Sequence, residues 1–440
     1  MHKYAMNSAA DFMPVDRLRA IQNQKFMKRF HYTYANVEWY RNLLAKHNVD
    51  PNEIKSIADI SKLPCIVKTD LRDTYPLGML ATSMDNIIRF HASSGTTGKP
   101  IVIPYTREDL DVWSECVARC LTMFGLDEQD VLQVGYGYGL FTGGLGLHDG
   151  GERRHCAVVP ASGGNTQRHL MFIKDLDVTA IACTPSYFLH IIDHAQKLGY
   201  NWKESKLRVG IFGAEPWTDG MRSFIEQETG IVAHDIYGLT EISGPGVAGD
   251  CSCHAGMHIF EDHFYPEIID PDTLQPLPDG EEGELVFTTL DKTGMPLIRY
   301  RTRDITRLIP EQCACGRTIR RIGRISHRSD DMMIVRGVNV FPGQIESVLT
   351  GVDPGLIHYT IHLDSNDTGL ATIEVKFEAT PAMYEEFKAD PAKSENLSRL
   401  VANRLRETVG IGFKTTVVEQ NSIPRSEGKM KRIYDNRKQA

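Results

Sequence analysis

An alternation of short apolar runs with helical stretches is the feature that most constrains the fold of this chain. Buried strands are predicted at Val131–Val134, Ala157–Val159, Val178–Cys183 and Leu207–Phe212. Helices are predicted around them at Leu110–Met123, Tyr187–Lys197 and Thr218–Glu228. Because neighbouring parallel strands need a long crossover connection, usually a helix, this alternation predicts a mainly parallel sheet flanked by helices. The fold class is therefore α/β.

The pattern of the chain changes near residue 330. Beyond it, strands are predicted at Met332–Arg336, Leu356–Leu363, Ala371–Glu378 and Thr415–Gln420, and a polar helix at Ser394–Val409. Before it, Glu284–Thr289 and Ile305–Ile309 are predicted as later strands. We therefore predict two domains, a large N-terminal one at 1–329 and a small α+β one at 330–440, joined near His327–Asp331.

The composition excludes several classes of protein. Hydrophobic residues make up 41% and charged residues 24% of the 440-residue chain, which is enough apolar material for a large core. The net charge of −8 argues against a nucleic-acid surface, and no apolar stretch is long enough to span a membrane. The first residues lack the apolar segment of a secretion signal, so we expect a cytoplasmic enzyme. Its nine cysteines are then expected to be reduced thiols or metal ligands.

A loop rich in glycine and hydroxyl residues is the strongest local signal. Its sequence is Ser93-Ser94-Gly95-Thr96-Thr97-Gly98-Lys99-Pro100, and it follows a predicted strand at Ile87–Phe90. The glycines allow backbone N–H groups to converge, and the hydroxyls and the lysine add donors suited to a polyphosphate. The loop is not a Walker A motif, which has four residues between its glycines, because only two separate Gly95 from Gly98. A surface turn is the alternative interpretation.

The loop resembles the phosphate loop of the acyl-adenylate-forming superfamily, and four later segments follow in the order typical of that superfamily. These segments are Tyr237-Gly238-Leu239-Thr240-Glu241, Tyr300-Arg301-Thr302-Arg303-Asp304, Arg328-Ser329-Asp330-Asp331 with Arg336-Gly337, and Pro424-Arg425-Ser426-Glu427-Gly428-Lys429. Three further segments resemble the phenylacetate–CoA ligase family, namely Gly135–Gly144, His258–Glu267 and Arg336–Pro342. Two positions depart from the family: Phe260, where tryptophan is expected, and His327, where glycine is usual.

The resemblance implies an AMP-forming ligase whose partners are small molecules. It would use ATP and Mg²⁺ to convert an aryl-acetic acid, with phenylacetate as the first candidate, to an acyl-AMP, and would then transfer the acyl group to CoA. The resemblance also implies a homodimer and a mobile C-terminal domain. The same adenylation with a different acid, or with a carrier protein or deazaflavin coenzyme as acceptor, is the alternative. A nucleotide sensor without catalysis is disfavoured because Lys429, Glu241 and Asp304 are all present.

The resemblance also assigns roles to individual residues. Lys429 would bridge the substrate carboxylate and the α-phosphate, Thr240 would donate to that phosphate, and Glu241 would bind Mg²⁺. The nucleotide would contact the loop Ser93–Lys99 together with Ala214, Glu215, Pro216, Asp235, Tyr237, Gly238, Asp304 and Arg328. Rotation about Asp330 would remove Lys429 and open a path for pantetheine beside Gly337. From the residues alone, Lys429 could be a solvated lysine, Tyr237 a core aromatic, and Asp304 the partner of Arg301 or Arg303.

The segment Gly135–Gly144 is a candidate wall of the acyl pocket. Five of its ten residues are glycine, which lets a flat ring approach the backbone closely. Tyr136, Tyr138, Phe141 and Gly143 are the candidate substrate contacts. Ordinary core packing of the aromatic side chains is the alternative.

Two cysteine-rich segments predict a structural zinc site. They are Cys251-Ser252-Cys253-His254, followed by His258, and Cys313-Ala314-Cys315-Gly316. Structural zinc takes four tetrahedral ligands of the Cys and His type. The preferred set is Cys251, His258, Cys313 and Cys315, and Cys253 or His254 could replace one of these. Free thiols on a surface loop are the alternative.

Overall fold

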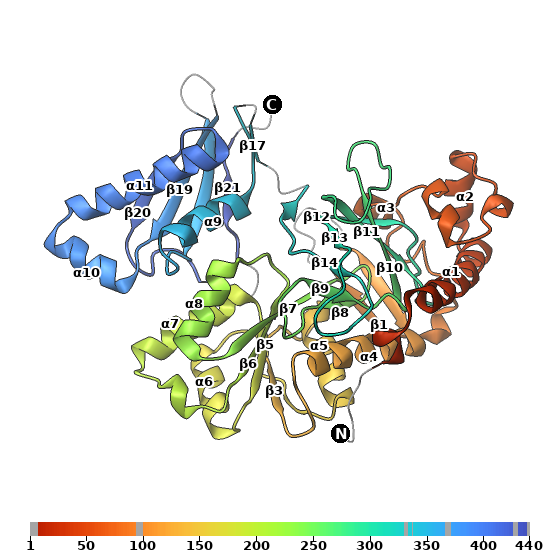
Figure 1. The fold of residues 1–440 in the computed structure, drawn as a ribbon, viewed down its shortest axis with the longest axis horizontal. Helices are drawn as coiled ribbons and strands as arrows, with labels where there is room; N and C mark the ends of the chain where they lie inside the picture. Colours follow the sequence, from red (N-terminus) through yellow and green to blue (C-terminus); the bar gives the residue numbers. More distant parts are fainter. Residues whose placement is uncertain are drawn as a thin grey trace.

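The computed structural model of the chain describes residues 8–93, 100–329, 333–336, 338–365, 371–425 and 430–437. Figure 1 shows a C-terminal part, in blue, that lies above helices α7 and α8 of a larger N-terminal part. Among the described residues, no helix combines the length and the apolar character needed to cross a lipid bilayer. Short 3₁₀ helices occur at Ala9–Phe12, Pro51–Glu53, Ile57–Lys62, Met84–Asn86 and Trp202–Glu204.

The largest sheet of the N-terminal part has nine strands in the order β13-β14-β9-β8-β7-β6-β5-β3-β4. Their bounds are β3 (Val131–Val134), β4 (Ala157–Val159), β5 (Ala180–Cys183), β6 (Val209–Gly213), β7 (Val232–Leu239), β8 (Gly244–Gly249), β9 (Met257–Ile259), β13 (Leu308–Ile309) and β14 (Arg321–Ile322). Strands β3, β4, β5 and β6 pair in parallel, as predicted, and β7, which was not predicted, adds a further parallel strand. The rest of the sheet is antiparallel, because the turn from β7 to β8 is too short for a crossover.

Helices cover the parallel strands. They are α4 (Arg107–Met123), α5 (Thr142–Arg153), α6 (Thr166–Asp175), α7 (Pro185–Lys197) and α8 (Asp219–Thr229). Local sequence explains their ends: Thr184 caps α7 by accepting from the backbone N–H of Tyr187, and Pro185 fits the first turn. Gly230 ends α8 with a φ of 77°, which favours glycine. The predictions for α4, α7 and α8 are therefore confirmed to within three residues.

A second, antiparallel sheet contains β10 (Phe264–Ile269), β11 (Gly283–Thr289), β12 (Tyr300–Thr306) and β15 (His327–Arg328). Figure 1 places it near α1 (Val15–Asn36), α2 (Glu38–Lys46) and α3 (Lys68–Asp73). The prediction of one strand at Ile305–Ile309 is wrong, because Arg307 separates β12 in this sheet from β13 in the larger sheet. A hairpin of β1 (Ile87–Ala92) and β2 (Val102–Thr106) precedes α4 and flanks the predicted phosphate loop.

The C-terminal part has its own sheet, in the order β20-β19-β18-β21, and a separate hairpin of β16 and β17. Its elements are β16 (Met333–Val335), β17 (Val338–Val340), α9 (Pro342–Val352), β18 (Tyr359–Ser365), β19 (Ala371–Glu378), α10 (Pro381–Ala389), α11 (Ala392–Val409), β20 (Lys414–Val418) and β21 (Ile433–Asp435). Side chains from these elements form a hydrophobic cluster of their own. The predicted α+β content is confirmed, and the division at residue 329 stays a prediction.

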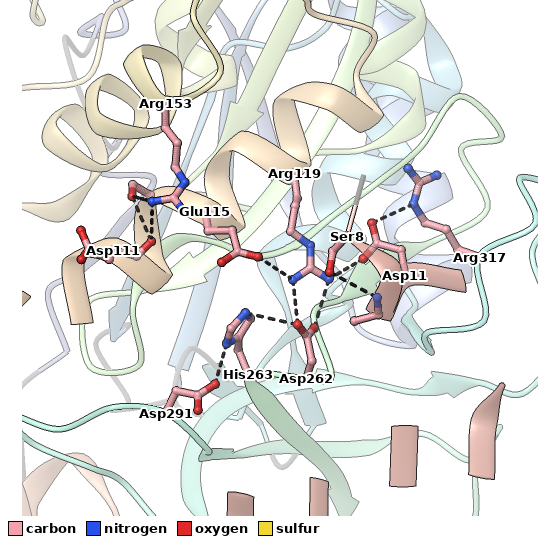
Figure 2. A network of polar contacts seen from close by, with 12 residues as sticks. Ser8, Asp11, Asp111, Glu115, Arg119, Arg153, Asp262, His263, Asp291 and Arg317 are labelled. Atoms are coloured by element: carbon pink, nitrogen blue, oxygen red, sulfur yellow. Dashed lines mark hydrogen bonds and ion pairs between the residues drawn. The ribbon is translucent and has the colours of Figure 1, made fainter. Parts of the chain in front are cut away.

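A buried arginine ties the N-terminal segment to this framework (Figure 2). Arg119 on α4 donates to both carboxylate oxygens of Asp262 at 3.0 Å and also binds Asp11. Its guanidinium lies 4.1 Å from the ring centre of Phe260, the position at which the resembled family has tryptophan. Burial opposes ionisation of Asp262, but His263 and Arg119 outweigh it and lower the pKa of this carboxyl to about 2. The network is thus a set of buried charges that all have partners.

Candidate active site

A cavity of about 400 Å³ lies between the two sheets of the N-terminal part. Its floor comes from the residues that follow β6, from the end of β7 and the turn after it, and from β12. Ligands of open α/β sheets bind outside the carboxyl ends of parallel strands, which is where this cavity is found. Met430 from the C-terminal part also lines it.

The cavity brings together most of the site residues predicted from the sequence. Those that line it are Ser93, Tyr136, Phe141, Gly143, Ala214, Glu215, Pro216, Asp235, Tyr237, Gly238, Thr240, Glu241, Asp304 and Arg328. Tyr138 does not line it, and its hydroxyl lies 3.2 Å from Nδ1 of His148 instead. The predicted residues Ser94, Gly95, Thr96, Thr97, Gly98, Lys99, Asp330, Gly337 and Lys429 lie outside the described residues.

A carboxylate on β12 is held at one end of the cavity by two donors. The Tyr237 hydroxyl donates to Asp304 Oδ2 at 2.6 Å, and Arg328 Nη1 donates to Oδ1 at 3.0 Å. Arg301 and Arg303, the alternative partners of Asp304 from the sequence, form ion pairs with Glu284. Burial, with Asp304 alongside, raises the pKa of Tyr237, so its hydroxyl stays protonated and keeps donating.

Two further carboxylates line the cavity and are partly open to it. Burial raises the pKa of Asp235 to about 6, and the nearby Asp250 adds to this effect, while Arg324 opposes it. Burial also raises the pKa of Glu215. Glu215 Oε1 accepts from the backbone N–H of Ser186 at 2.8 Å, and Oε2 accepts from that of Met430 at 3.4 Å. This end of the cavity therefore offers acceptors suited to ligand N–H groups.

The turn after β7 carries Thr240 and Glu241, both buried. A buried lysine supports this turn: Lys292 Nζ donates to the carbonyl oxygens of Glu241 at 3.1 Å and Ile242 at 2.7 Å. The Glu241 carboxylate forms an ion pair with Lys68 Nζ at 3.1 Å. A buried carboxylate beside a cavity suits a hard cation such as Mg²⁺. Lys68 and Lys292 were not predicted from the sequence.

A second cluster lies apart from the cavity lining and fits a four-coordinate metal. The ligand atoms of Cys251, His258, Cys313 and Cys315 all lie within 4.8 Å of one another. Cys251 Sγ and Cys313 Sγ are 3.7 Å apart, close to the spacing of about 3.8 Å that tetrahedral zinc with Zn–S bonds of about 2.3 Å requires. His258 Nδ1 lies 3.4 Å from the carbonyl oxygen of Ile319, which leaves Nε2, 3.4 Å from Cys315 Sγ, for a metal.

These four residues are the preferred set predicted from the sequence. The two alternatives lie outside the cluster. Cys253 is exposed, and His254 Nδ1 lies 2.8 Å from Asp250 in a separate group with His234. Burial lowers the pKa of His258 to about 4, so its imidazole is neutral and can act as a ligand near pH 7.

Comparison with known proteins decides the family. The profile of the AMP-binding enzyme family matches residues 19–290, and that of the AMP-binding enzyme C-terminal domain matches residues 337–437. The chain is 45% identical over 437 residues to phenylacetate-coenzyme A ligase from Aromatoleum evansii, with 98% of each chain covered. The chain belongs to the phenylacetate–CoA ligase family.

Solved structures relate this family member to particular conformational states. It superposes on 2-hydroxyisobutyryl-CoA ligase in the postadenylation state with a TM-score of 0.90, at 25% identity, covering 97% of this chain and 91% of that one. The thioesterification state of the same ligase, with 2-hydroxyisobutyryl-AMP and CoA bound, gives a TM-score of 0.71 at 26% identity, with 98% and 92% covered. The two parts of the chain are therefore arranged more like the postadenylation state.

Proposed function

We propose that this protein is an AMP-forming ligase that activates phenylacetate with ATP and transfers the phenylacetyl group to CoA. The observation that carries the proposal is one cavity in which an aromatic and glycine wall, the held carboxylate of Asp304, and the Thr240–Glu241 turn meet. The 45% identity to a phenylacetate-coenzyme A ligase over nearly the whole chain supports it. Tyr136, Phe141 and Gly143 would face the ring of the acid.

In the first step, a carboxylate oxygen of phenylacetate attacks the α-phosphorus of ATP. A bond forms between them, the bond to the β-phosphate breaks, and pyrophosphate leaves with its electron pair. Because two negatively charged groups must approach, positive charge is needed at the reacting atoms. Lys429 and a Mg²⁺ held by Glu241 would supply that charge, and Thr240 would donate to the α-phosphate. Asp304 would accept from the ribose hydroxyls, and Asp235 from the adenine amino group.

In the second step, the sulfur of CoA attacks the acyl carbon of phenylacetyl-AMP. The bond from that carbon to AMP breaks, AMP leaves, and the thiol proton is lost to solvent. The C-terminal domain would turn about Asp330 between the steps, so that Lys429 leaves the cavity and pantetheine enters beside Gly337. Arg328, next to this hinge, would contact the ribose or a phosphate.

We propose zinc at the four-residue cluster as a structural metal. Cys251, His258, Cys313 and Cys315 provide the donor types and spacing that structural zinc needs. Cys313 and Cys315 lie between β13 and β14, and Thr318 on the same connection donates to the carbonyl oxygen of Met13. Zinc would therefore fasten the N-terminal segment and the end of the large sheet rather than take part in the reaction.

The wider setting is also a proposal. A ligase of this kind would act in the cytoplasm, as a homodimer, in the catabolism of phenylacetate, and its small-molecule partners would be ATP, the acid and CoA. The net charge of −8 gives no support to a nucleic-acid partner.

The test is a pyrophosphate-release assay over a panel of carboxylic acids, with and without CoA. We expect phenylacetate to give the highest kcat/KM. The advantage of phenylacetate over acetate in activation free energy should exceed the value for a single methylene group, which is about 1–3 kcal/mol. Formation of phenylacetyl-CoA should require ATP. Equal kcat/KM for acetate and phenylacetate would exclude an aryl pocket. Pyrophosphate release without a CoA thioester would instead favour a carrier protein or a deazaflavin coenzyme as the acceptor.

A further inference from the structure

A carboxylate on α7 contacts a histidine and an arginine of the C-terminal part. Asp193 Oδ2 lies 3.1 Å from His358 Nε2, just before β18, and 3.3 Å from Arg425 Nε. Burial opposes ionisation of Asp193, but His358 and Arg425 outweigh it, so the pKa of this carboxyl is lowered. No role in the reaction sequence described above uses Asp193, and it does not line the cavity.

Arg425 is itself fixed to the C-terminal sheet. Its Nη1 and Nη2 donate to the two carboxylate oxygens of Glu378 at 2.9 and 2.7 Å. Glu378 also accepts from the backbone N–H groups of Asn421 and Ile423 at 3.0 and 2.9 Å. The segment that leads toward Lys429 is therefore held rigidly to β19, and the Nε of Arg425 remains to reach across to Asp193.

Close packing accompanies the ion pairs in the same interface. Gly220 on α8 faces Thr350 on α9, and a Cβ added at Gly220 would lie only 2.7 Å from Thr350 Cβ. Ile357, which is 3% exposed, belongs to the hydrophobic cluster built mainly from α6, α7 and α8 of the large part. Figure 1 shows α9 directly above α8. The two parts thus meet closely in the arrangement that resembles a postadenylation state.

A rotation of the C-terminal domain would keep some of these contacts and break others. The bonds between Glu378 and Arg425 lie within the C-terminal part and move with it. The contacts of Asp193 join the two parts, so a rotation that carries Met430 away from the cavity must break them. Asp193 therefore stabilises only the domain orientation in which it contacts Arg425 and His358.

We infer that Asp193 is a positioning residue for the adenylation step. Through Arg425 and His358 it holds the C-terminal part in the orientation that places Met430 at the cavity. Thioester formation follows rotation and does not depend on it. This inference rests on the proposed function, because it assigns Asp193 to one of the two proposed half-reactions.

The test compares Asp193→Asn with Asp177→Asn in the full-length protein. Asp177 is a matched control because it is an exposed carboxylate whose ion pair, with Lys206 at 2.8 Å, lies within the large part. We expect Asp193→Asn to lower kcat for phenylacetate-dependent pyrophosphate release about tenfold, with the KM for ATP unchanged. Conversion of supplied phenylacetyl-AMP and CoA to the thioester should stay within twofold of wild type. Asp177→Asn should match wild type in both assays.

Two further variants distinguish the loss of the interdomain contact from a general loss of folding. In an Arg425→Gln background, Asp193→Asn should have little additional effect, because the two residues act through one contact. Gly220→Ala should strengthen α8 through helix propensity yet crowd Thr350, and should slow the same half-reaction. Equal loss in both half-reactions for Asp193→Asn, or no loss in adenylation, would overturn the inference.

Amide hydrogen exchange measures the contact without turnover. Asp193→Asn should increase exchange in α9, Pro342–Val352, and Asp177→Asn should not. Unchanged exchange in α9 would overturn the positioning role. If wild type releases no pyrophosphate with any acid while exchange still responds to Asp193→Asn, the proposed function fails and the interdomain contact stands.

Discussion

Buried charge is arranged differently around Arg119 and around the cavity. Arg119 is closed in by Asp262, Asp11 and the ring of Phe260, so each charge has a partner within the protein (Figure 2). The cavity end near Asp235 and Glu215 has two carboxylates whose pKa values are raised by burial. The first arrangement stabilises the fold, and the second leaves acceptors for a ligand to satisfy.

The two regions also show that burial alone does not set a pKa. Burial opposes the ionisation of both Asp262 and the cavity residue Asp235, yet the pKa of Asp262 is lowered to about 2 and that of Asp235 is raised to about 6. The difference is the neighbouring charge, which is cationic around Asp262 and includes the carboxylate of Asp250 near Asp235. Substitutions in the two regions should therefore affect different properties.

The largest expected effect is a loss of activity at Lys429, with no change in stability. Lys429→Ala should slow phenylacetyl-AMP formation about 10³-fold, equivalent to about 4 kcal/mol, because we propose that its charge stabilises the transition state at the α-phosphate. Thioester formation from supplied phenylacetyl-AMP should stay near normal, as measured in single-turnover assays. Lys431→Ala, which removes a lysine whose Nζ lies 4.9 Å from the ring centre of Tyr434, is the control. Equal impairment of both half-reactions would contradict the assignment of Lys429.

A substitution in the buried network around Arg119 should lower stability and leave ATP binding unchanged. Arg119→Met would leave Asp11 and Asp262 buried without their main partner and should destabilise the protein by about 3 kcal/mol. Urea unfolding measures this change, and the KM for ATP of the folded variant should be that of wild type. Arg153→Met, which removes an exposed arginine bonded to Ser114 and the carbonyl of Asp111, should cost less than about 1 kcal/mol. A stable Arg119→Met variant with weakened ATP binding would contradict the assignment of the Arg119 network to stability rather than to ligand binding.

Local motifs explain what could be predicted from the sequence. Tyr237–Glu241 and Tyr300–Asp304 carry their chemistry within five residues, so the sequence alone indicates it. The cysteine cluster was predicted because two tight pairs of ligand residues are visible in the chain. Lys68 and Lys292 were missed because each is an isolated lysine whose role depends on contact with Glu241 or its backbone.

Tertiary packing explains the errors in the fold. Strand β8 contains three glycines and a proline, which disfavour a strand by propensity, but Gly246 allows Val117 of α4 to pack against its backbone. The apolar run Ile305–Ile309 does not reveal that Arg307 marks the change from one sheet to another. Tyr138 lies in the predicted wall segment, yet its side chain points to His148 rather than the cavity.

A smaller effect on stability is expected at the cluster of Cys251, His258, Cys313 and Cys315, where we propose a structural zinc. Wild type purified without chelators should contain about one zinc per chain. Replacing Cys313 and Cys315 with serine should remove it and lower stability by about 2 kcal/mol, a few degrees in Tm, while turnover stays detectable. Cys253→Ser, at an exposed cysteine outside the cluster, should keep the metal. Absence of stoichiometric metal in fresh wild-type protein would contradict the zinc proposal.

The smallest expected effect is a pH dependence of ATP binding, which we expect from the proposed contact of Asp235 with adenine. With a pKa of about 6, this carboxyl is ionised above that pH and loses its charge below it. If adenine binds the ionised form, the KM for ATP should rise about fourfold from pH 7.5 to 5.5 in wild type but not in Asp235→Asn. Protonation of ATP itself acts equally on both proteins, so the ratio of their KM values isolates the side chain.

The ionisation of Asp235 should also make the stability of the folded protein depend on pH. Folding raises the pKa of Asp235 from 3.8, so the folded protein holds this proton more tightly than the unfolded chain does. The resulting stabilisation is present below about pH 4 and is lost as the pH rises toward 6. Asp235→Asn, which cannot ionise, should therefore gain stability relative to wild type across that window and keep the gain at pH 7. Urea unfolding at pH 4, 5, 6 and 7 measures this, and a constant difference between the two proteins would show that Asp235 has a partner, as Asp262 does.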